Sequence, residues 1–214
     1  YLLDAKEIKP DPVDAEVIQD PKGSIEFDDV AFSYDAKHPL LNHISFKAEP
    51  GQKIALVGPT GCGKTTLINL LLRFYSIDSG AIYVDGHNTQ KLTRASLREQ
   101  FGMVLQDTWL FKGTIKENIR YAKPDATDEE IIAAAQKAQA HEFIQQLPRG
   151  YGSMVGESGG SLSQGQQQLL CIARVMLANP PILLLDEATS SIDTRTEQLV
   201  QKAFDTIMNG RTSL

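Results

Sequence analysis

The spacing of hydrophobic residues in the first part of the chain is typical of β-strands. Between residues 24 and 48, hydrophobic and polar positions alternate, as they do in strands that bury one face. Residues 43–48 form one such stretch, in which Ile44 and Phe46 are expected to point inward. The pattern predicts several short strands, followed by a turn at Pro50 and Gly51.

Runs that are more continuously hydrophobic predict four further strands. Residues 81–84 and 101–105 are two of them. Residues 53–57 and 181–185 are so uniformly hydrophobic that both strands are expected to be buried.

Helical spacing fills most of the remaining chain. The predicted helices cover residues 67–74, 114–146 with a break near Pro124, 163–178 and 195–208. Thr127 and Glu130 fit a capping box. A long loop is expected between Pro148 and Gly160. Strands interleaved with helices predict an α/β fold with a helical insertion in the middle.

Composition narrows the class of protein. The 214 residues, 42% of them hydrophobic, are enough for one core with a smaller lobe. A net charge of -6 argues against nucleic acid and anionic lipid as general partners. Cys62 and Cys171 are expected to be reduced cytoplasmic thiols. The sequence has no signal peptide and no hydrophobic run near the ~20 residues of a membrane span, so it is expected to be soluble.

One glycine-rich segment carries the clearest chemistry. Residues 58–65 satisfy the phosphate-loop pattern G-x-x-x-x-G-K-[ST], with a hydrophobic strand predicted before it and a helix after it. Glycines let backbone N–H groups curve around phosphates, and the helix N-terminus adds partial positive charge. Lys64 would reach the β- and γ-phosphates, and the Thr65 hydroxyl would bind Mg²⁺. The sequence therefore predicts a nucleoside triphosphate site.

Two carboxylates follow the second buried strand. Asp186 and Glu187 come directly after four hydrophobic residues, at the strand end where ligands of open α/β sheets gather. Asp186 would hold Mg²⁺, and Glu187 would act as general base on the attacking water. The competing interpretation is two solvated carboxylates after a core strand.

These motifs together resemble the nucleotide-binding domain of ABC transporters. Tyr34 matches the aromatic residue that stacks on adenine, and Gln106 matches the Q-loop glutamine. Residues 162–166 (LSQGQ) match the signature motif, residues 186–189 the extended Walker B motif, and residues 190–193 the D-loop. The resemblance implies a P-loop NTPase fold of the ABC type, with a RecA-like core, an N-terminal antiparallel β subdomain and an inserted α-helical subdomain.

Other segments resemble the exporter branch of this family. These are the run from Gln106 to Ile119 and the run from Leu147 to Glu157. Residues 1–22 are rich in proline and acidic residues, which predicts an extended linker rather than a packed element. The resemblance implies that this linker leads from a preceding transmembrane domain. Residues 23–214 would then be the nucleotide-binding domain, with its helical subdomain at about 107–175. The expected location is the cytoplasmic face of a membrane.

The resemblance also assigns roles to individual residues. ATP with Mg²⁺ would be bound between two domains in a head-to-tail dimer, where Ser163 faces the γ-phosphate held by the partner's loop. Hydrolysis would power export, with Glu187 as the catalytic residue. The expected metal ligands are Thr65, Gln106 and Asp186. The expected nucleotide-binding residues are Tyr34, Gly58, Thr60, Gly61, Cys62, Gly63, Lys64, Thr65, Thr66, Gln106, Ser163, Gly165 and Gln166.

The sequence departs from the family pattern in two places. Gln164 replaces a signature glycine, either as neutral variation or because this chain pairs with a non-identical subunit. The family's switch histidine is expected beyond Leu214, and none of the four histidines lies where it should be. We therefore expect this stretch alone to bind ATP but to hydrolyse it weakly.

Several alternatives remain at this point. The chain could be a DNA-repair or translation ATPase with the same fold, or a regulatory, non-hydrolysing half of a heterodimer. The run after Gln106 and the net charge disfavour the first, and Glu187 disfavours the second. Cys62 is either a small residue at a tolerant position or an oxidation-sensitive thiol. Trp109 and Phe111 either pack in the core or contact a membrane-domain helix.

Overall fold

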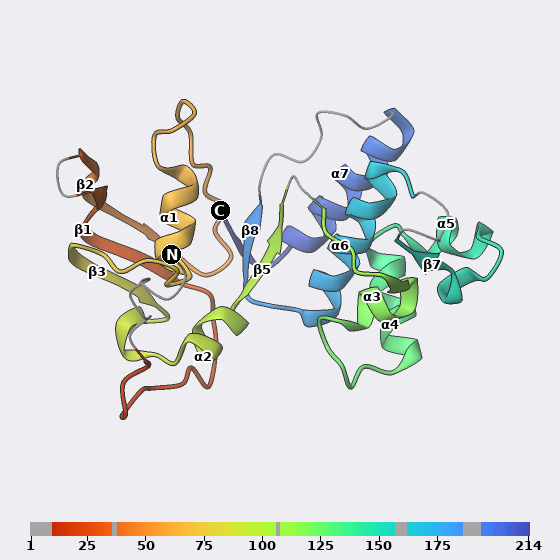
Figure 1. The fold of residues 1–214 in the computed structure, drawn as a ribbon, viewed down its shortest axis with the longest axis horizontal. Coiled ribbons are helices and arrows are strands. Elements are labelled where there is room, and N and C mark those ends of the chain that lie inside the picture. Colours follow the sequence, from red (N-terminus) through yellow and green to blue (C-terminus); the bar gives the residue numbers. More distant parts are fainter. Residues whose placement is uncertain (1–9, 36–37, 106–107, 157–161, 186–193) are drawn as a thin grey trace, which may run out of the picture. The chain divides into compact units, whose positions relative to one another are not determined.

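The computed structural model describes residues 10–35, 38–105, 108–156, 162–185 and 194–214. Clustering of the backbone divides the chain into two compact units (Figure 1). Unit 1 consists of Tyr1–Glu49 and Leu56–Gln100, and unit 2 consists of Pro50–Ala55 and Phe101–Leu214. Each unit is described by itself.

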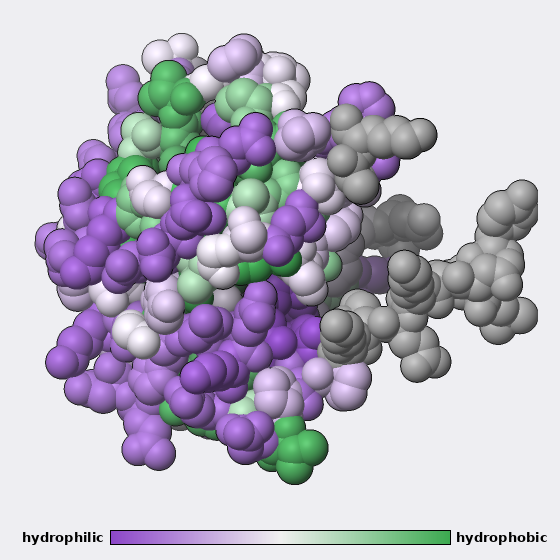
Figure 2. Space-filling view, turned by 90° about the vertical axis from the view of Figure 1, so that its left-hand side faces the viewer, coloured by the Kyte–Doolittle hydropathy of each residue, from purple (hydrophilic) through white to green (hydrophobic). Residues whose placement is uncertain are grey.

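Unit 1 is built on an antiparallel sheet with the strand order β2-β1-β3-β4. Phe27 pairs with Phe46, and their rings stack with centroids 4.7 Å apart. On the side seen in Figure 2, hydrophobic residues are interspersed among hydrophilic ones, as expected for strands with one solvated face. The predicted alternation is confirmed, but the first strands are two long, bulged strands rather than several short ones. The strands are β1 (Ile25–Asp35), β2 (His38–Ala48), β3 (Ser79–Val84) and β4 (His87–Asn88).

Helix α1 (Lys64–Leu71) begins three residues before the predicted start and ends three residues before the predicted end. Arg73 adopts a left-handed conformation with φ 56°, which stops the helix. The N–H of Phe74 then donates to the carbonyl of Asn69 at 2.8 Å, and that of Arg73 to Leu70 at 3.0 Å. This is the Schellman pattern of helix ends, here with arginine instead of glycine. A 3₁₀ turn (Thr89–Lys91) and α2 (Arg94–Glu99) complete unit 1.

Residues 10–22 pack against the rest of unit 1, and we call this segment the strap. The expectation that residues 1–22 are extended but not packed is wrong for this part. Glu16 forms a parallel bridge with Leu92, Ile18 is buried at 7% exposure, and Asp11 is ion-paired with Arg94 at 2.6 Å. Prolines and acidic residues indicate an extended backbone, but they do not reveal that arginines and the backbone at Leu92 are available to hold it.

Unit 2 contains a parallel sheet with the order β5-β8-β9. The strands are β5 (Phe101–Val104), β8 (Ile182–Leu185) and β9 (Thr212–Ser213), and the predicted strands at 101–105 and 181–185 are confirmed. A Cβ added to Gly102 would lie 2.3 Å from Cγ1 of Val175. Glycine at this position therefore lets the helix that carries Val175 pack directly on β5.

Helix α6 (Gln164–Ala178) is the centre of unit 2, because it contacts β5 and three other helices. Those helices are α3 (Ile115–Arg120), α4 (Asp128–Lys137) and α7 (Thr194–Met208). The predicted break near Pro124 and the capping box of Thr127 and Glu130 are confirmed. Helix α5 (His141–Gln146) follows α4. None of the helices in the described part of the chain is long and hydrophobic enough to cross a membrane.

The predicted loop between Pro148 and Gly160 contains two short regular elements. They are a 3₁₀ turn (Gly150–Gly152) and β7 (Met154–Val155), which pairs with β6 (Gly113–Thr114). A strand pairing of only two residues could not be predicted from the sequence, because hydrophobic alternation needs a longer stretch to be recognised.

The predicted buried strand at residues 53–57 is not formed as a regular strand. Lys53 makes an isolated parallel bridge with Ser213, and Ile54 donates to the Ser213 carbonyl at 2.8 Å. Val57, at the end of the predicted run, is 93% exposed. The overall prediction nevertheless holds, since the fold is α/β with an antiparallel β subdomain and a parallel core sheet.

Candidate nucleotide-binding site

The glycine-rich loop precedes α1 in unit 1. Gly61 and Gly63 have φ values of 83° and 101°, in the region that L-residues rarely adopt. A Cβ at Gly63 would also lie 2.7 Å from Cδ2 of Leu41 on β2. The N–H of Cys62 donates to the Pro59 carbonyl at 3.2 Å, which closes a turn within the loop. The loop therefore has the tight, curved backbone that the motif predicts.

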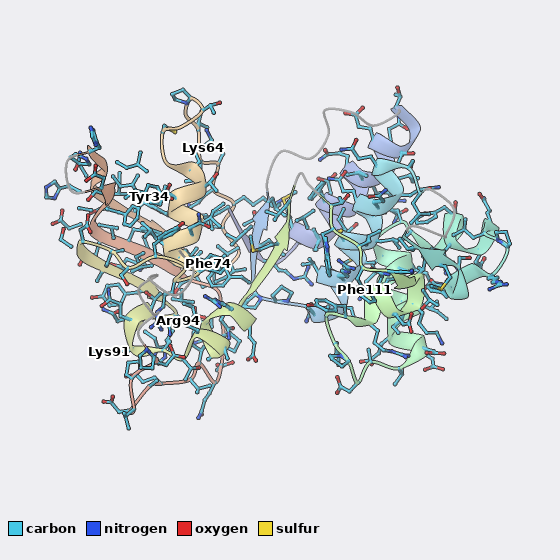
Figure 3. All side chains as sticks on the ribbon, in the orientation of Figure 1. Tyr34, Lys64, Phe74, Lys91, Arg94 and Phe111 are labelled. Carbon is cyan, nitrogen blue, oxygen red and sulfur yellow. The ribbon has the colours of Figure 1, made fainter. Side chains whose placement is uncertain are left out.

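Lys64 is the first residue of α1, and its side chain folds back across the loop (Figure 3). Its Nζ donates to the carbonyl of Gly58 at 2.6 Å and to that of Pro59 at 3.1 Å. The thiol of Cys62 lies 3.9 Å from the same nitrogen. These contacts hold a positive charge over the loop.

The N-terminus of α1 has no side-chain cap. Among the described residues, no side chain caps α1 or α5, whereas Thr93, Thr114 and Thr127 cap α2, α3 and α4. The first N–H groups of a helix have no partner within the helix and carry partial positive charge. Together with Lys64, they make this end of α1 suited to bind an anion such as a phosphate.

Tyr34 and Thr66 connect the antiparallel sheet to this helix. Their hydroxyl oxygens are hydrogen-bonded at 3.1 Å, and Tyr34 lies beside α1 in Figure 3. Thr66 is buried at 6% exposure, but Tyr34 remains 57% exposed. The structure therefore brings together the predicted adenine-binding aromatic residue and the predicted phosphate loop within unit 1. Thr60 and Thr65, also predicted to bind nucleotide, are exposed.

The signature segment forms the start of α6 in unit 2. Ser163 is the N-cap, as predicted, and its Oγ accepts from the N–H of Gln166 at 3.3 Å. The Gln166 side chain accepts from the N–H of Ser163 at 3.0 Å, which completes a capping box. Gly165 is buried and Gln164 is exposed. Because Ser163 uses a lone pair in this cap, its hydroxyl proton can still be donated to an anion.

Three predicted residues lie outside the described part of the chain. They are Gln106, Asp186 and Glu187. The roles of Gln106 and Asp186 as metal ligands and of Glu187 as general base therefore stay predictions. Thr65, the remaining predicted Mg²⁺ ligand, presents an exposed hydroxyl group at the start of α1. Its placement fits a cation bound beside phosphate oxygens.

Unit 2 also contains an aromatic cluster around Arg174, formed by Trp109, Phe111 and Tyr121. The Arg174 guanidinium lies 5.7 to 5.9 Å from the three ring centroids and donates to the Trp109 carbonyl at 2.6 Å. Burial lowers the pKa of Arg174 from its ordinary value. Trp109 and Tyr121 are 60% and 64% exposed. The cluster of Trp109 and Phe111 was predicted, but Tyr121 and Arg174 were missed.

A sequence model of the family described as ABC transporter matches residues 41–190. The chain belongs to the ABC transporter family. The matched range includes the phosphate loop, the signature segment and the predicted Walker B carboxylates. It agrees with the resemblance that the motifs indicated.

Relatives of known name are similar over nearly the whole chain. An uncharacterised ABC transporter ATP-binding protein of Bacillus subtilis is 53% identical, over 100% of this chain and 35% of its own length. A fatty acid ABC transporter ATP-binding/permease protein of Mycobacterium bovis is 50% identical, over 99% of this chain and 33% of its length. This chain thus spans about one third of the length of these relatives.

A solved structure has the same fold. It is that of a bacterial Atm1-family ABC exporter with ATP bound, which is 42% identical to this chain. The similarity has a TM-score of 0.88 and covers 99% of this chain and 37% of the exporter chain. This family membership disfavours the repair and translation ATPases considered above.

Proposed function

We propose that this domain binds ATP with Mg²⁺ and hydrolyses it to power export across a membrane. The observation that carries the proposal is the position of Lys64. Its ammonium lies over a loop of left-handed glycines, at a helix N-terminus that no described side chain caps. This arrangement supplies the backbone donors, the partial charge and the cation that a triphosphate requires.

The chemistry would be divided among the predicted residues. Lys64 and the N–H groups of the loop bind the β- and γ-phosphates, and Tyr34 binds the adenine base. Thr65, Gln106 and Asp186 would hold Mg²⁺, and the ion, when bound, would neutralise charge on the phosphate oxygens. Glu187 accepts the proton of the attacking water. The Ser163 hydroxyl donates to the γ-phosphate on a partner domain.

The motor role in export is supported by the relatives. The Mycobacterium bovis relative is an ATP-binding/permease protein, and the solved relative is an exporter. We propose that a transmembrane domain precedes residues 1–22 and contacts the exposed rings of Trp109 and Tyr121. Arg174 lies among the three rings and donates to the carbonyls of Asn118 and Trp109, which supports the rings as a surface for a membrane-domain helix. The domain would lie at the cytoplasmic face of that membrane.

A second candidate function rests on Gln164. The exposed glutamine at the first position of α6 places a Cβ and a long side chain where the family has glycine. A chain with this substitution suits a heterodimer, in which it contributes a weakened signature to one of two sites. In the regulatory version of this hypothesis, this chain would be the half of the heterodimer that binds ATP without hydrolysing it. Purification of the full transporter tests this pairing, and a single polypeptide species with equal turnover at both sites would exclude it.

The decisive experiment uses the full transporter in membrane vesicles. Glu187→Gln should retain ATP binding and abolish turnover, because the amide cannot accept the proton of water. Glu197→Gln, an exposed residue at the start of α7, is the matched control and should keep full turnover. Turnover that survives Glu187→Gln would refute the assignment of the general base.

A further inference from the structure

Tyr34 is held by aromatic neighbours as well as by Thr66. The ring of Phe32 lies 4.8 Å away at an interplanar angle of 85°, and the ring of Tyr75 lies 5.1 Å away at 90°. The rings of Phe32 and Tyr75 are also in contact, with centroids 5.8 Å apart. Both neighbours are perpendicular to Tyr34, the arrangement that the charge distribution of aromatic rings favours.

These contacts come from two different elements. Phe32 lies on the same strand as Tyr34, two residues earlier, so the two side chains share one face of β1. Thr66 and Tyr75 belong to the phosphate-loop helix and to the segment directly after it. Tyr34 is therefore contacted from the first turn of α1, by Thr66, and from the residues just after the helix, by Tyr75.

The contacts of Tyr34 with Thr66 and with Tyr75 restrict different movements of its ring. A hydrogen bond at the hydroxyl tip fixes one point of the ring but allows the ring to turn about its long axis. The ring of Tyr75 is perpendicular to that of Tyr34, with centroids 5.1 Å apart, and this contact opposes the rotation. With both contacts in place, the plane of Tyr34 has a defined angle to the loop that ends at Gly63.

We propose that Tyr75 is a positioning residue that sets the plane of Tyr34 for stacking against the base of a bound adenine nucleotide. The inference rests on the proposed function, since it concerns the same nucleotide. Tyr34 is 57% exposed, so a planar base can reach it. The phosphate loop directly precedes α1, and Tyr75 follows it by four residues. The distance between the Tyr34 ring that would stack on the base and the loop that would bind the phosphates is therefore set before the nucleotide binds.

The test measures two ligands on the full transporter, ATP and inorganic tripolyphosphate, each with Mg²⁺. Tyr75→Leu should weaken ATP binding by about threefold to tenfold, the range expected for one aromatic pair. Tripolyphosphate has no base, so its affinity should not change. Tyr75→Phe retains the ring and should restore ATP affinity. Tyr83→Leu, which removes a ring from β3 in the same unit, is the matched control.

A spectroscopic readout separates positioning from general damage. The fluorescence of an ethenoadenine analogue of ATP falls when its base stacks on tyrosine. At saturation, Tyr75→Leu should reduce this quenching, while Tyr83→Leu should leave it unchanged. Unchanged quenching, or equal losses for ATP and tripolyphosphate, would overturn the positioning role. If the unaltered transporter bound neither ligand, the proposed function itself would fail, and this inference with it.

Discussion

The Nζ atom of Lys64 lies 2.6 Å from the carbonyl oxygen of Gly58, six residues earlier in the same loop. The side chain thus spans the loop that it is expected to serve. A lysine oriented in this way has already lost much of its rotational freedom, which lowers the entropic cost of binding phosphate.

Replacement of this lysine should remove nucleotide binding without unfolding the domain. Lys64→Met should weaken ATP binding by about 100-fold, because charge-assisted hydrogen bonds contribute ~1.5–3 kcal/mol each. The unfolding free energy should change by less than ~1 kcal/mol, since the side chain is only partly buried. Calorimetric titration measures the first effect and urea unfolding the second. Lys91→Met, an exposed lysine of unit 1, should leave both unchanged.

Gly63 should be intolerant of any side chain. Gly63→Ala would place a methyl group against Leu41 at a φ of 101°, and it should lower the unfolding free energy by roughly 2–4 kcal/mol. Gly86→Ala is the matched control, because Gly86 also has a positive φ but no atom lies within 4 Å of its added Cβ. It should cost only about 1 kcal/mol. If both variants lowered the unfolding free energy equally in urea, the contact of the added methyl group with Leu41 would not contribute to the loss of stability.

The strap should depend on one carboxylate. Asp11→Asn removes a charge that pairs with Arg94 at 2.6 Å and Arg73 at 3.5 Å. Since these groups are partly buried, the variant should lower the unfolding free energy by about 1 kcal/mol and expose residues 10–22 to protease. Asp20→Asn, in the same segment but exposed, should have neither effect. Identical cleavage rates for both variants would contradict the strap's attachment.

The helix caps of unit 2 should make stability fall in acid. A hydrogen bond from Lys123 and another from the Thr127 backbone lower the pKa of Glu130 below its ordinary value of 4.5. A lowered folded-state pKa stabilises the fold above pH 4.5, and this contribution is lost as the pH falls through the folded-state pKa. The bond from the Thr114 backbone acts in the same direction on Glu117.

This pH dependence can be assigned by substitution. Glu130→Gln keeps a side chain that can complete the capping box but cannot titrate. Its thermal midpoint should therefore fall less between pH 5 and about pH 3 than that of the unaltered protein. Glu129→Gln, the adjacent exposed residue, should leave the slope unchanged. A Glu130→Gln variant with an unaltered acid slope would refute the linkage.

Local patterns predicted those parts of the structure that depend on local interactions. The cap of Ser163, the capping box of Thr127 and the loop that ends at Lys64 each depend on residues a few positions apart. They were predictable because hydrogen bonds of this kind are specified by spacing alone.

The features that the sequence did not reveal depend on distant partners. Val57 lies in a hydrophobic run that predicts a buried strand, yet the structure leaves it exposed, because burial depends on which elements lie beside the run and not on the run itself. Tyr75 and Arg174 were missed because their partners are far away in the sequence. No periodicity along one segment can identify a contact of that kind.

The strap also determines how this unit would respond to a mechanical load. Tension applied to the chain ahead of Pro10 would first act on Asp11, and through its ion pairs on Arg94 of α2 and on Arg73. Arg73 is the left-handed residue that ends α1, so the force would enter the phosphate-loop helix from its far end. The sheet strand β1, although next in the sequence, would be shielded by the pairing of Glu16 with Leu92. A pull on the strap would therefore reach α2 and the end of α1 before it stretched the sheet.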